Sequence, residues 1–182
     1  MAPFFTAEGD SGETGFLGKG KLSKASVRIE AVGSVDEASA FLGFARSLTE
    51  NEHLRSILLH IQKTLYLLMA ELSAAPEAAD QFDKISQDDI QWLESQIGDL
   101  ENEVTMPSEF IIPGETPVSA ALAVARAVVR RAERRAAALL EAGEIGKPLL
   151  IAYLNRLSSL IFVLEVYETS INSGGIRTVK EA

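Results

Sequence analysis

The sequence predicts an all-α protein: a single-domain five-helix bundle that follows an extended loop rich in Gly and Lys. After about residue 25, apolar residues recur every three or four positions, which is the period of a helix that buries one face. No stretch shows the alternation of a strand, and short connections rich in Pro and Gly separate the helical stretches. The 182 residues, 47% of them hydrophobic, suffice for one core. We divide the chain into a loop (1–25), a bundle (26–173) and a tail (174–182).

The first two helices are expected at residues 27–48 and 52–73. In the first, Ser34 and Glu37 have the spacing of a capping box. Pro76 follows the end of the second helix. Each helix has one apolar stripe, formed in the first by Ala31, Val35, Ala38, Leu42 and Ala45, and in the second by Leu54, Ile57, Leu58, Ile61, Leu65, Leu68 and Leu72.

Three further helices follow. Ser86 and Asp89 form a second capping pair, and the third helix runs from there to about residue 103. Thr116 as N-cap and Pro117 at the first helical position open the fourth helix, which ends near residue 142. The fifth helix covers about 148–173 and ends before a pair of glycines.

Composition excludes several classes of function. Without cysteine the chain has no disulfide, no thiolate metal site and no thiol nucleophile, and it suits a reducing cytoplasm. The two histidines, His53 and His60, lack partners with ligand spacing, so we expect no closed metal site. A net charge of −9 argues against a nucleic-acid partner. No leader-like start or bilayer-length apolar run is evident, so we expect a cytoplasmic protein without a membrane partner.

The Gly-rich segment 4–24 is the first candidate site. Its five glycines leave amide groups free to surround an anion, and Lys19, Lys21 and Lys24 add positive charge that suits a polyphosphate. A P-loop is excluded because Leu22 stands where that motif requires Ser or Thr. The alternative, a mobile surface segment, stays open on this pattern alone.

A second candidate site is the arginine cluster 125–136, in which five arginines surround one glutamate. Helical geometry places Arg126, Arg130 and Glu133 on one face, and Arg131 and Arg135 largely on the other. The row of Arg126, Arg130 and Glu133 can contact a ligand in a buried or inter-subunit site. The row of Arg131 and Arg135 can contact solvent or a neighbouring chain. The alternative is a set of solvated charges in the later turns of a helix.

Three other polar groups complete the candidates. Asn155 and Arg156 interrupt an apolar helix, either as a structural polar pair or as a contact for adenosine. Asp36 and Glu37 are adjacent and therefore point about 100° apart, which excludes a shared acid and base pair. Glu50 begins a single Glu-x-x-His element, but a di-iron bundle needs a second one.

Taken together, these motifs resemble one family over nearly the whole chain. TAEGDSGETGFL, EAVGSVDEASAFLG, FIIPGETPVSAAL, ARAVVRRAERR and LNRLSSLIF occur in the order seen in the PduO type of ATP:cob(I)alamin adenosyltransferase. The resemblance implies a homotrimer that binds ATP, Mg²⁺ and cobalamin where two subunits meet. It also implies a corrinoid reductase and an adenosylcobalamin-dependent mutase as partners.

The resemblance also implies roles for individual residues. It assigns ATP to Thr6, Gly9, Asp10, Gly12, Thr14, Lys24, Arg130, Glu133 and Asn155. It assigns cobalamin to Phe110, against the lower face of the corrin, and to Asp36 and Arg126, a pair that joins two subunits. Catalysis then depends on Lys24, Arg130, Asp36 and Arg126, with no metal ligand among the side chains.

The implied reaction transfers the 5'-deoxyadenosyl group of ATP to cob(I)alamin and releases triphosphate, which requires neither a protein base nor a thiol. Four positions depart from the family pattern: Ala7, Glu115, Ala123 and Ser159. The tail after Tyr167 also lacks an aromatic residue that could close over the corrin. These departures leave open a non-catalytic carrier of ATP or corrinoid, and a structural helical adaptor is a further alternative.

Overall fold

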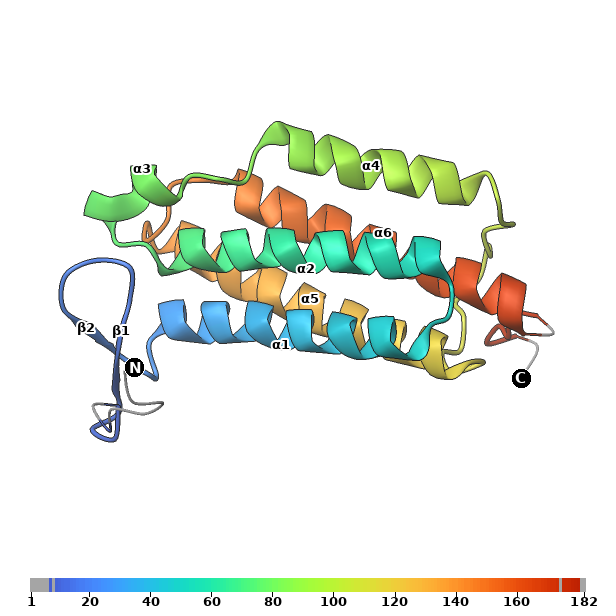
Figure 1. The fold of residues 1–182 in the computed structure, drawn as a ribbon, viewed down its shortest axis with the longest axis horizontal. Coiled ribbons are helices and arrows are strands. Elements are labelled where there is room, and N and C mark those ends of the chain that lie inside the picture. The colour runs from blue at the N-terminus through green and yellow to red at the C-terminus, as the bar shows by residue number, and fades with distance from the viewer. Residues whose placement is uncertain (1–6, 8, 174, 181–182) are drawn as a thin grey trace.

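Five long helices form the body of the protein in a computed structural model that describes residue 7 and residues 9–173 and 175–180 (Figure 1). The helices are α1 (Val27–Leu48), α2 (Glu52–Ser73), α4 (Gln87–Glu101), α5 (Pro117–Glu141) and α6 (Leu149–Asn172). The predicted five-helix bundle is thereby confirmed, and each predicted boundary lies within two residues of the observed one.

The helix starts depend on the side chains that cap them. Ser26 caps α1 and accepts from Ile29 N at 3.4 Å. The predicted capping pair of Ser34 and Glu37 is wrong, because Ser34 lies inside the helix and donates to Glu30 O at 2.8 Å.

The other two predicted caps are confirmed. At the start of α4, the backbone N–H of Ser86 donates to the carboxylate of Asp89 at 2.8 Å. At the start of α5, Thr116 accepts from Ser119 N at 3.0 Å, with Pro117 at the first helical position as predicted. Each pair satisfies backbone N–H groups that a helix start would otherwise leave open.

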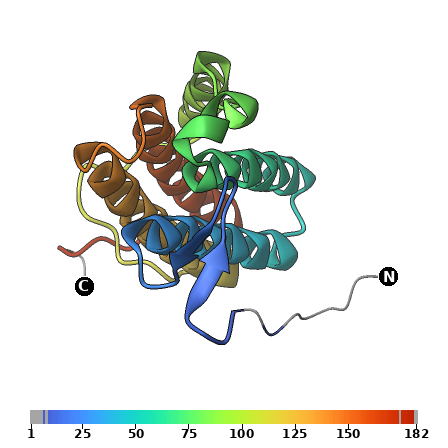
Figure 2. The same ribbon diagram turned by 90° about the vertical axis from the view of Figure 1, so that its left-hand side faces the viewer.

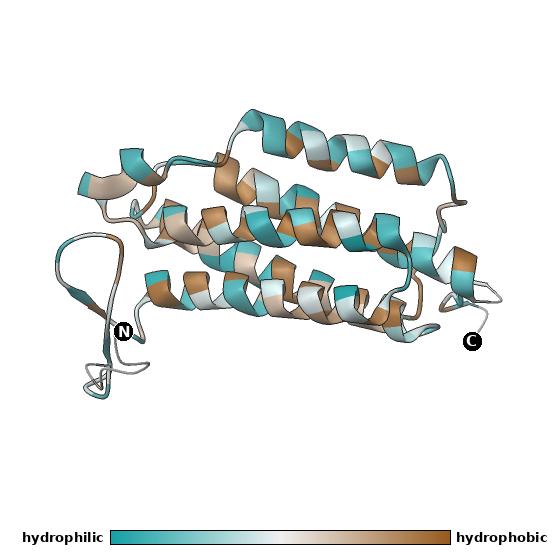
Figure 3. Cartoon of the chain, viewed as in Figure 1, coloured by the Kyte–Doolittle hydropathy of each residue, from teal (hydrophilic) through white to brown (hydrophobic). Residues whose placement is uncertain are grey.

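The core lies between α1, α2, α5 and α6, with α4 packed on α6. Every residue of the two predicted apolar stripes on α1 and α2 is buried. Hydrophobic residues gather on the facing sides of the helices, and hydrophilic ones dominate the outer sides (Figure 3). α6 is long and apolar enough to span a membrane, but 61% of its most apolar window is buried inside the bundle. Its composition is that of a core helix.

Four short elements were not predicted. Strands β1 (Glu13–Gly15) and β2 (Lys21–Ser23) pair antiparallel within the expected loop, and α2 is followed by the 3₁₀ turn η1 (Pro76–Ala78) and the short helix α3 (Ala79–Phe82). Elements of three or four residues are too short for a hydrophobic period to be detected.

The hairpin stands at one end of the bundle (Figure 2). Leu17 attaches it to the end of α2: its N–H donates to Ser73 O at 3.1 Å, and its carbonyl accepts from Ala75 N at 2.7 Å. The buried Arg28 joins elements at the same end, because it donates to Leu72 O, Ala74 O and Glu144 O at 2.7–3.0 Å.

Candidate functional site

The arginine cluster lies on α5 and divides between two neighbouring helices. Arg131 and Arg135 form ion pairs with Glu37 and Glu30 of α1, so the second row contacts its own chain. The first row shares one side of α5, as the helical phase predicted, and the structure shows that this side faces α6. The two rows thus have different environments, and the one on the α6 side is available for a ligand.

Polar residues of α6 meet this first row. Asn155 donates to Glu133 at 2.9 Å, which brings together two of the residues expected near adenosine. Both Asn155 and Arg156 are exposed, and Arg156 pairs with Glu94 of α4 at 2.8 Å. The helix therefore carries an outer polar edge rather than a buried polar pair.

Two hollows adjoin along this face. The smaller, about 250 Å³, contains Arg130 with Ser158 and Ser159 of α6. The larger, about 430 Å³, is bordered by the loop around Phe110. Arg126 and Phe162 border both hollows, and the guanidinium carbon of Arg126 lies 5.5 Å from the centroid of the Phe162 ring. This distance is typical of a cation–π contact.

A residue that the sequence analysis did not single out lies behind Arg126. The side chain of Glu165 on α6 is only 1% exposed, and its Oε2 is 3.7 Å from Nε of Arg126. Burial raises the pKa of Glu165 to about 7, and the charge of Arg126 opposes this rise only in part. A carboxylate in the most apolar helix was the signal that could have identified it.

Phe110 projects from the connection between α4 and α5 and is 87% exposed. The chain after α6 pairs with this connection: Val179 N donates to Phe110 O at 3.0 Å, and Ile112 N donates to Arg177 O at 2.8 Å. We call residues 175–180 the tail strap. An exposed aromatic ring on a loop fixed by backbone hydrogen bonds is suited to meet a flat apolar ligand.

Ion pairs reinforce the tail strap. Arg177 lies 3.3 Å from Glu115, and Lys180 pairs with Glu109. Glu115 is one of the four departures from the family pattern, so this departure has a structural role here. Among the others, Ala123 is buried on α5, and Ser159 borders the smaller hollow.

The structure gathers most of the predicted loop residues around one turn. Lys24 N donates to Gly12 O at 2.8 Å, and a Cβ added at Gly9 would lie 2.9 Å from Nζ of Lys24. Gly12 has a φ of +82°, which favours glycine. Asp10 is exposed and Thr14 is half-buried on β1. Thr6 lies outside the described residues.

Position 7 has an unusual backbone. Ala7, another departure from the family pattern, has a φ of +58°, which a residue with a Cβ seldom adopts. Its carbonyl accepts from Asp10 N at 3.2 Å and so closes the turn before Gly12.

Among the described residues, the hairpin is attached to the end of α2, whereas the first arginine row faces α6. Leu17 bonds to the end of α2, and Glu77 accepts from Lys19 N at 3.4 Å. Asp36 is exposed on α1, whereas Arg126, its expected partner across a subunit interface, engages Glu165 of the same chain. The predicted residues thus form separate parts of a protomer.

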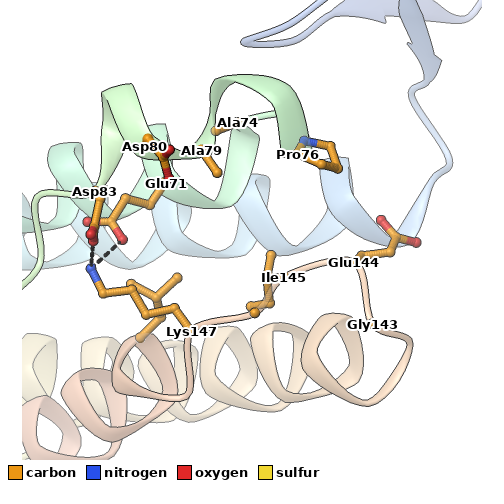
Figure 4. Close-up of a pocket in the computed structure, with 12 residues that line it drawn as sticks. Glu71, Ala74, Pro76, Ala79, Asp80, Asp83, Gly143, Glu144, Ile145 and Lys147 are labelled. Atoms are coloured by element: carbon orange, nitrogen blue, oxygen red, sulfur yellow. Dashed lines mark hydrogen bonds and ion pairs between the residues drawn. The ribbon is translucent and has the colours of Figure 1, made fainter.

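A further hollow of about 460 Å³ lies near the hairpin end (Figure 4). Three of its charged groups pair with one another, because Lys147 contacts Glu71 at 2.9 Å and also pairs with Asp83. The hydrogen bond from Lys147 and its charge lower the pKa of Asp83. These ion pairs join the connection before α6 to the end of α2 and to the residue that follows α3.

Metal-ligating side chains do not gather elsewhere in the part of the chain that the structure describes, where no three of His, Cys, Asp or Glu are placed to hold an ion. The side chains on the face of α5 and α6 offer positive charge and aromatic surface. Arginines suit an anion, and Phe110 and Phe162 suit a flat ring system.

Known proteins show the same fold and sequence pattern. The family profile described as cobalamin adenosyltransferase matches residues 4–168. A corrinoid adenosyltransferase of Bacillus subtilis is 36% identical to this chain. The alignment spans 87% of this chain and 82% of that protein. One from Citrobacter freundii is 35% identical, with 92% of its length covered by 89% of this chain.

A solved structure extends the comparison to three dimensions. A variant of the PduO-type ATP:corrinoid adenosyltransferase from Lactobacillus reuteri, complexed with cobalamin and ATP, has a TM-score of 0.91 and 29% identity to this protein. The match covers 98% of this chain and 99% of that one. Sequence and fold together show that the chain belongs to the cobalamin adenosyltransferase family, as a corrinoid adenosyltransferase of the PduO type.

Proposed function

We propose that this enzyme joins ATP and cobalamin at a site shared by two subunits of a homotrimer, with the hairpin segment of one subunit facing α5 and α6 of the next. The observation that carries this proposal is the pair of adjoining hollows on α5 and α6, one with Arg130 and the other with Phe110, divided by Arg126. Two neighbouring sites of different chemistry suit an anionic nucleotide and an apolar macrocycle.

The nucleotide side consists of residues from both subunits. Lys24 and Arg130 contact the triphosphate and stabilise the negative charge that it gains on leaving. Glu133, already held by Asn155, orients the adenosine. Thr6, Gly9, Asp10, Gly12 and Thr14 supply the loop that encloses the phosphates.

Mg²⁺ accompanies ATP in this proposal. The ion would be held by phosphate oxygens and water, as Mg²⁺ bound with a nucleotide commonly is. Asp10 is an exposed carboxylate within the phosphate loop and could contact the water shell of the ion. When bound, the ion supplies positive charge to the triphosphate.

The corrinoid side positions the nucleophile. Phe110 lies against the lower face of the corrin, and Asp36 pairs with Arg126 of the adjacent subunit beside it. The cobalt of cob(I)alamin attacks C5' of ATP and supplies both electrons of the new cobalt–carbon bond. The C5'–O bond breaks, and triphosphate leaves with the electron pair, so no proton transfer by the protein is needed.

An anaerobic assay tests the proposal. Protein, Mg-ATP and chemically reduced cobalamin are mixed without oxygen, and the absorption spectrum of the cobalt–carbon product is followed. Formation of the cobalt–carbon product over repeated turnovers supports an active enzyme. ATP binding in calorimetry without product would instead indicate a carrier, and the absence of ATP binding would indicate a structural adaptor.

Cellular context completes the proposal. We place the enzyme in the cytoplasm, where a corrinoid reductase supplies reduced cobalamin and an adenosylcobalamin-dependent mutase uses the product. We propose no nucleic-acid or membrane partner. Pull-down of the tagged trimer with and without cobalamin tests the two protein partners.

A further inference from the structure

Glu165 is an unusual residue for the interior of this bundle. Both of its carboxylate oxygens are buried without a hydrogen-bond partner in the structure, and so is Nε of Arg126. The 3.7 Å between Nε and Oε2 is too long for a hydrogen bond but short enough for strong electrostatic attraction. Glu165 therefore interacts with Arg126 mainly through charge.

Arg126 is confined from two directions. Phe162, one turn before Glu165 on α6, presents its ring to the guanidinium at 5.5 Å, and Glu165 attracts Nε. The arginine side chain remains 32% exposed and borders both hollows. The guanidinium thus forms part of the wall between them, and its place depends on two side chains of α6.

A buried carboxylate with no hydrogen bond destabilises a fold, and an apolar residue of similar volume would pack better at this position. The arginines on the α1 side of α5 show the less costly alternative, because they pair with exposed glutamates. A group that costs stability and contacts a site residue indicates a functional constraint.

We propose that Glu165 and Phe162 are positioning residues, which hold Arg126 in the wall between the two hollows and thereby set the place of the corrinoid relative to the nucleotide. This inference rests on the proposed function. Neither residue contacts the reacting atoms in this proposal, and both act through Arg126.

Glu165→Gln tests the inference, because it keeps the shape of the side chain and removes its charge. We expect the KM for cobalamin in the adenosylation assay to rise about 5- to 20-fold, while the Kd for ATP in calorimetry changes less than about 2-fold. Glu168→Gln is the matched control: this glutamate is also buried, lies one turn later on α6, and accepts a hydrogen bond from Asn172 at 2.9 Å rather than pairing with Arg126. Its KM for cobalamin should stay within about 2-fold of the parent.

A double-mutant cycle separates positioning from a direct contact with the corrinoid. In an Arg126→Met background, Glu165→Gln should change the Kd for cob(II)alamin by less than about 2-fold, because the guanidinium that Glu165 positions has been removed. Equilibrium dialysis measures this Kd. If Arg126→Met binds no corrinoid, the inference is tested by the comparison of Glu165→Gln with Glu168→Gln. Phe162→Leu, which removes the ring face, provides an independent check and should raise the KM for cobalamin about 2- to 5-fold.

The outcomes are distinguishable. A parent protein that forms no cobalt–carbon product contradicts the proposed function. An active parent whose KM for cobalamin is unchanged by both Glu165→Gln and Phe162→Leu overturns only this inference, as does an equal effect of Glu165→Gln and Glu168→Gln. A Glu165→Gln protein that fails to fold in circular dichroism would also overturn it, because Glu165 would then be a structural residue.

Discussion

Glu165 links the stability of the protein to pH. Its pKa is about 7 in the folded protein against an ordinary value of 4.5, because burial disfavours its charged form. The folded state therefore binds this proton more tightly than the unfolded state does. The contribution of Glu165 to stability is fully present below pH 4.5, declines as pH rises, and is lost above about pH 7.

This linkage predicts a gain of stability on neutralisation. At pH 8 we expect Glu165→Gln to be more stable than the parent by about 1–3 kcal/mol, because the mutation removes a buried charge that is incompletely compensated. At pH 4.5 the difference should disappear. Urea unfolding followed by circular dichroism at the two pH values measures it.

The control for this prediction is Glu94→Gln on the exposed surface of α4. Glu94 pairs with Arg156 in solvent, and such pairs contribute less than about 1 kcal/mol. An increase in stability for Glu165→Gln of equal size at both pH values would mean that its carboxyl group does not titrate between them.

Phe110 offers a second prediction for a single residue. With 87% of its surface exposed, Phe110→Ala should leave the melting temperature nearly unchanged. If the ring discourages axial ligation of cobalt, the variant should lose at least about 10-fold in adenosylation that starts from cob(II)alamin and a reductant. Adenosylation from chemically prepared cob(I)alamin should fall much less.

The rates from cob(II)alamin with a reductant and from cob(I)alamin are measured without oxygen on the same protein sample. The Phe110→Leu variant is the control, since it keeps an apolar side chain on the same loop and should lose less. Equal rates for Phe110→Ala and the parent from cob(II)alamin would remove this residue from the reduction step.

Among the elements, the tail strap has the clearest role. It is joined to the connection between α4 and α5 by two backbone hydrogen bonds and two ion pairs, and this connection presents Phe110. Removal of residues 174–182 should free the loop and raise the KM for cobalamin about 3- to 10-fold, with little change in the Kd for ATP.

The ion pairs alone should contribute little to this effect. Because Arg177 and Lys180 are exposed, the double variant Arg177→Ala/Lys180→Ala keeps the backbone pairing and should change the KM for cobalamin less than about 2-fold. If the truncated protein has the KM of the parent, the strap does not position Phe110.

The helices could be predicted from sequence because each has a long apolar stripe, and the stripe contains enough positions to distinguish a helix from a strand. The hairpin could not, since its strands have three residues each, too few for an alternating pattern to be detected. The capping pair assigned to Ser34 failed for another reason: the same residue spacing occurs inside a helix, where Ser34 bonds back to Glu30.

The site shows the same limits. Helical phase correctly predicted that Arg126, Arg130 and Glu133 share one side of α5, because that depends on one element alone. The role of Glu165 depends on how α5 and α6 pack, and no periodicity contains that information. The pairing of Glu115 with Arg177 likewise joins segments 62 positions apart and required the structure.

For the whole molecule, the question is how the phosphate loop reaches the arginine row. In one chain Lys24 lies beside Gly9 near the hairpin end, whereas Arg130 borders a hollow between α5 and α6. A shared site between subunits brings them together without a change of fold. It also makes each active site depend on two different chains.

Subunit mixing tests this arrangement. Lys24→Ala and Arg130→Ala should each lose about 10²–10³ in rate, because each removes a preorganised cation at the triphosphate. If the two variants are unfolded together, mixed in equal amounts and refolded, about one quarter of the sites should receive an intact loop from one chain and an intact arginine from another. About one quarter of the parental activity should return. Each variant refolded alone is the control, and a mixture no more active than the two separate samples would show that both residues act within a single chain.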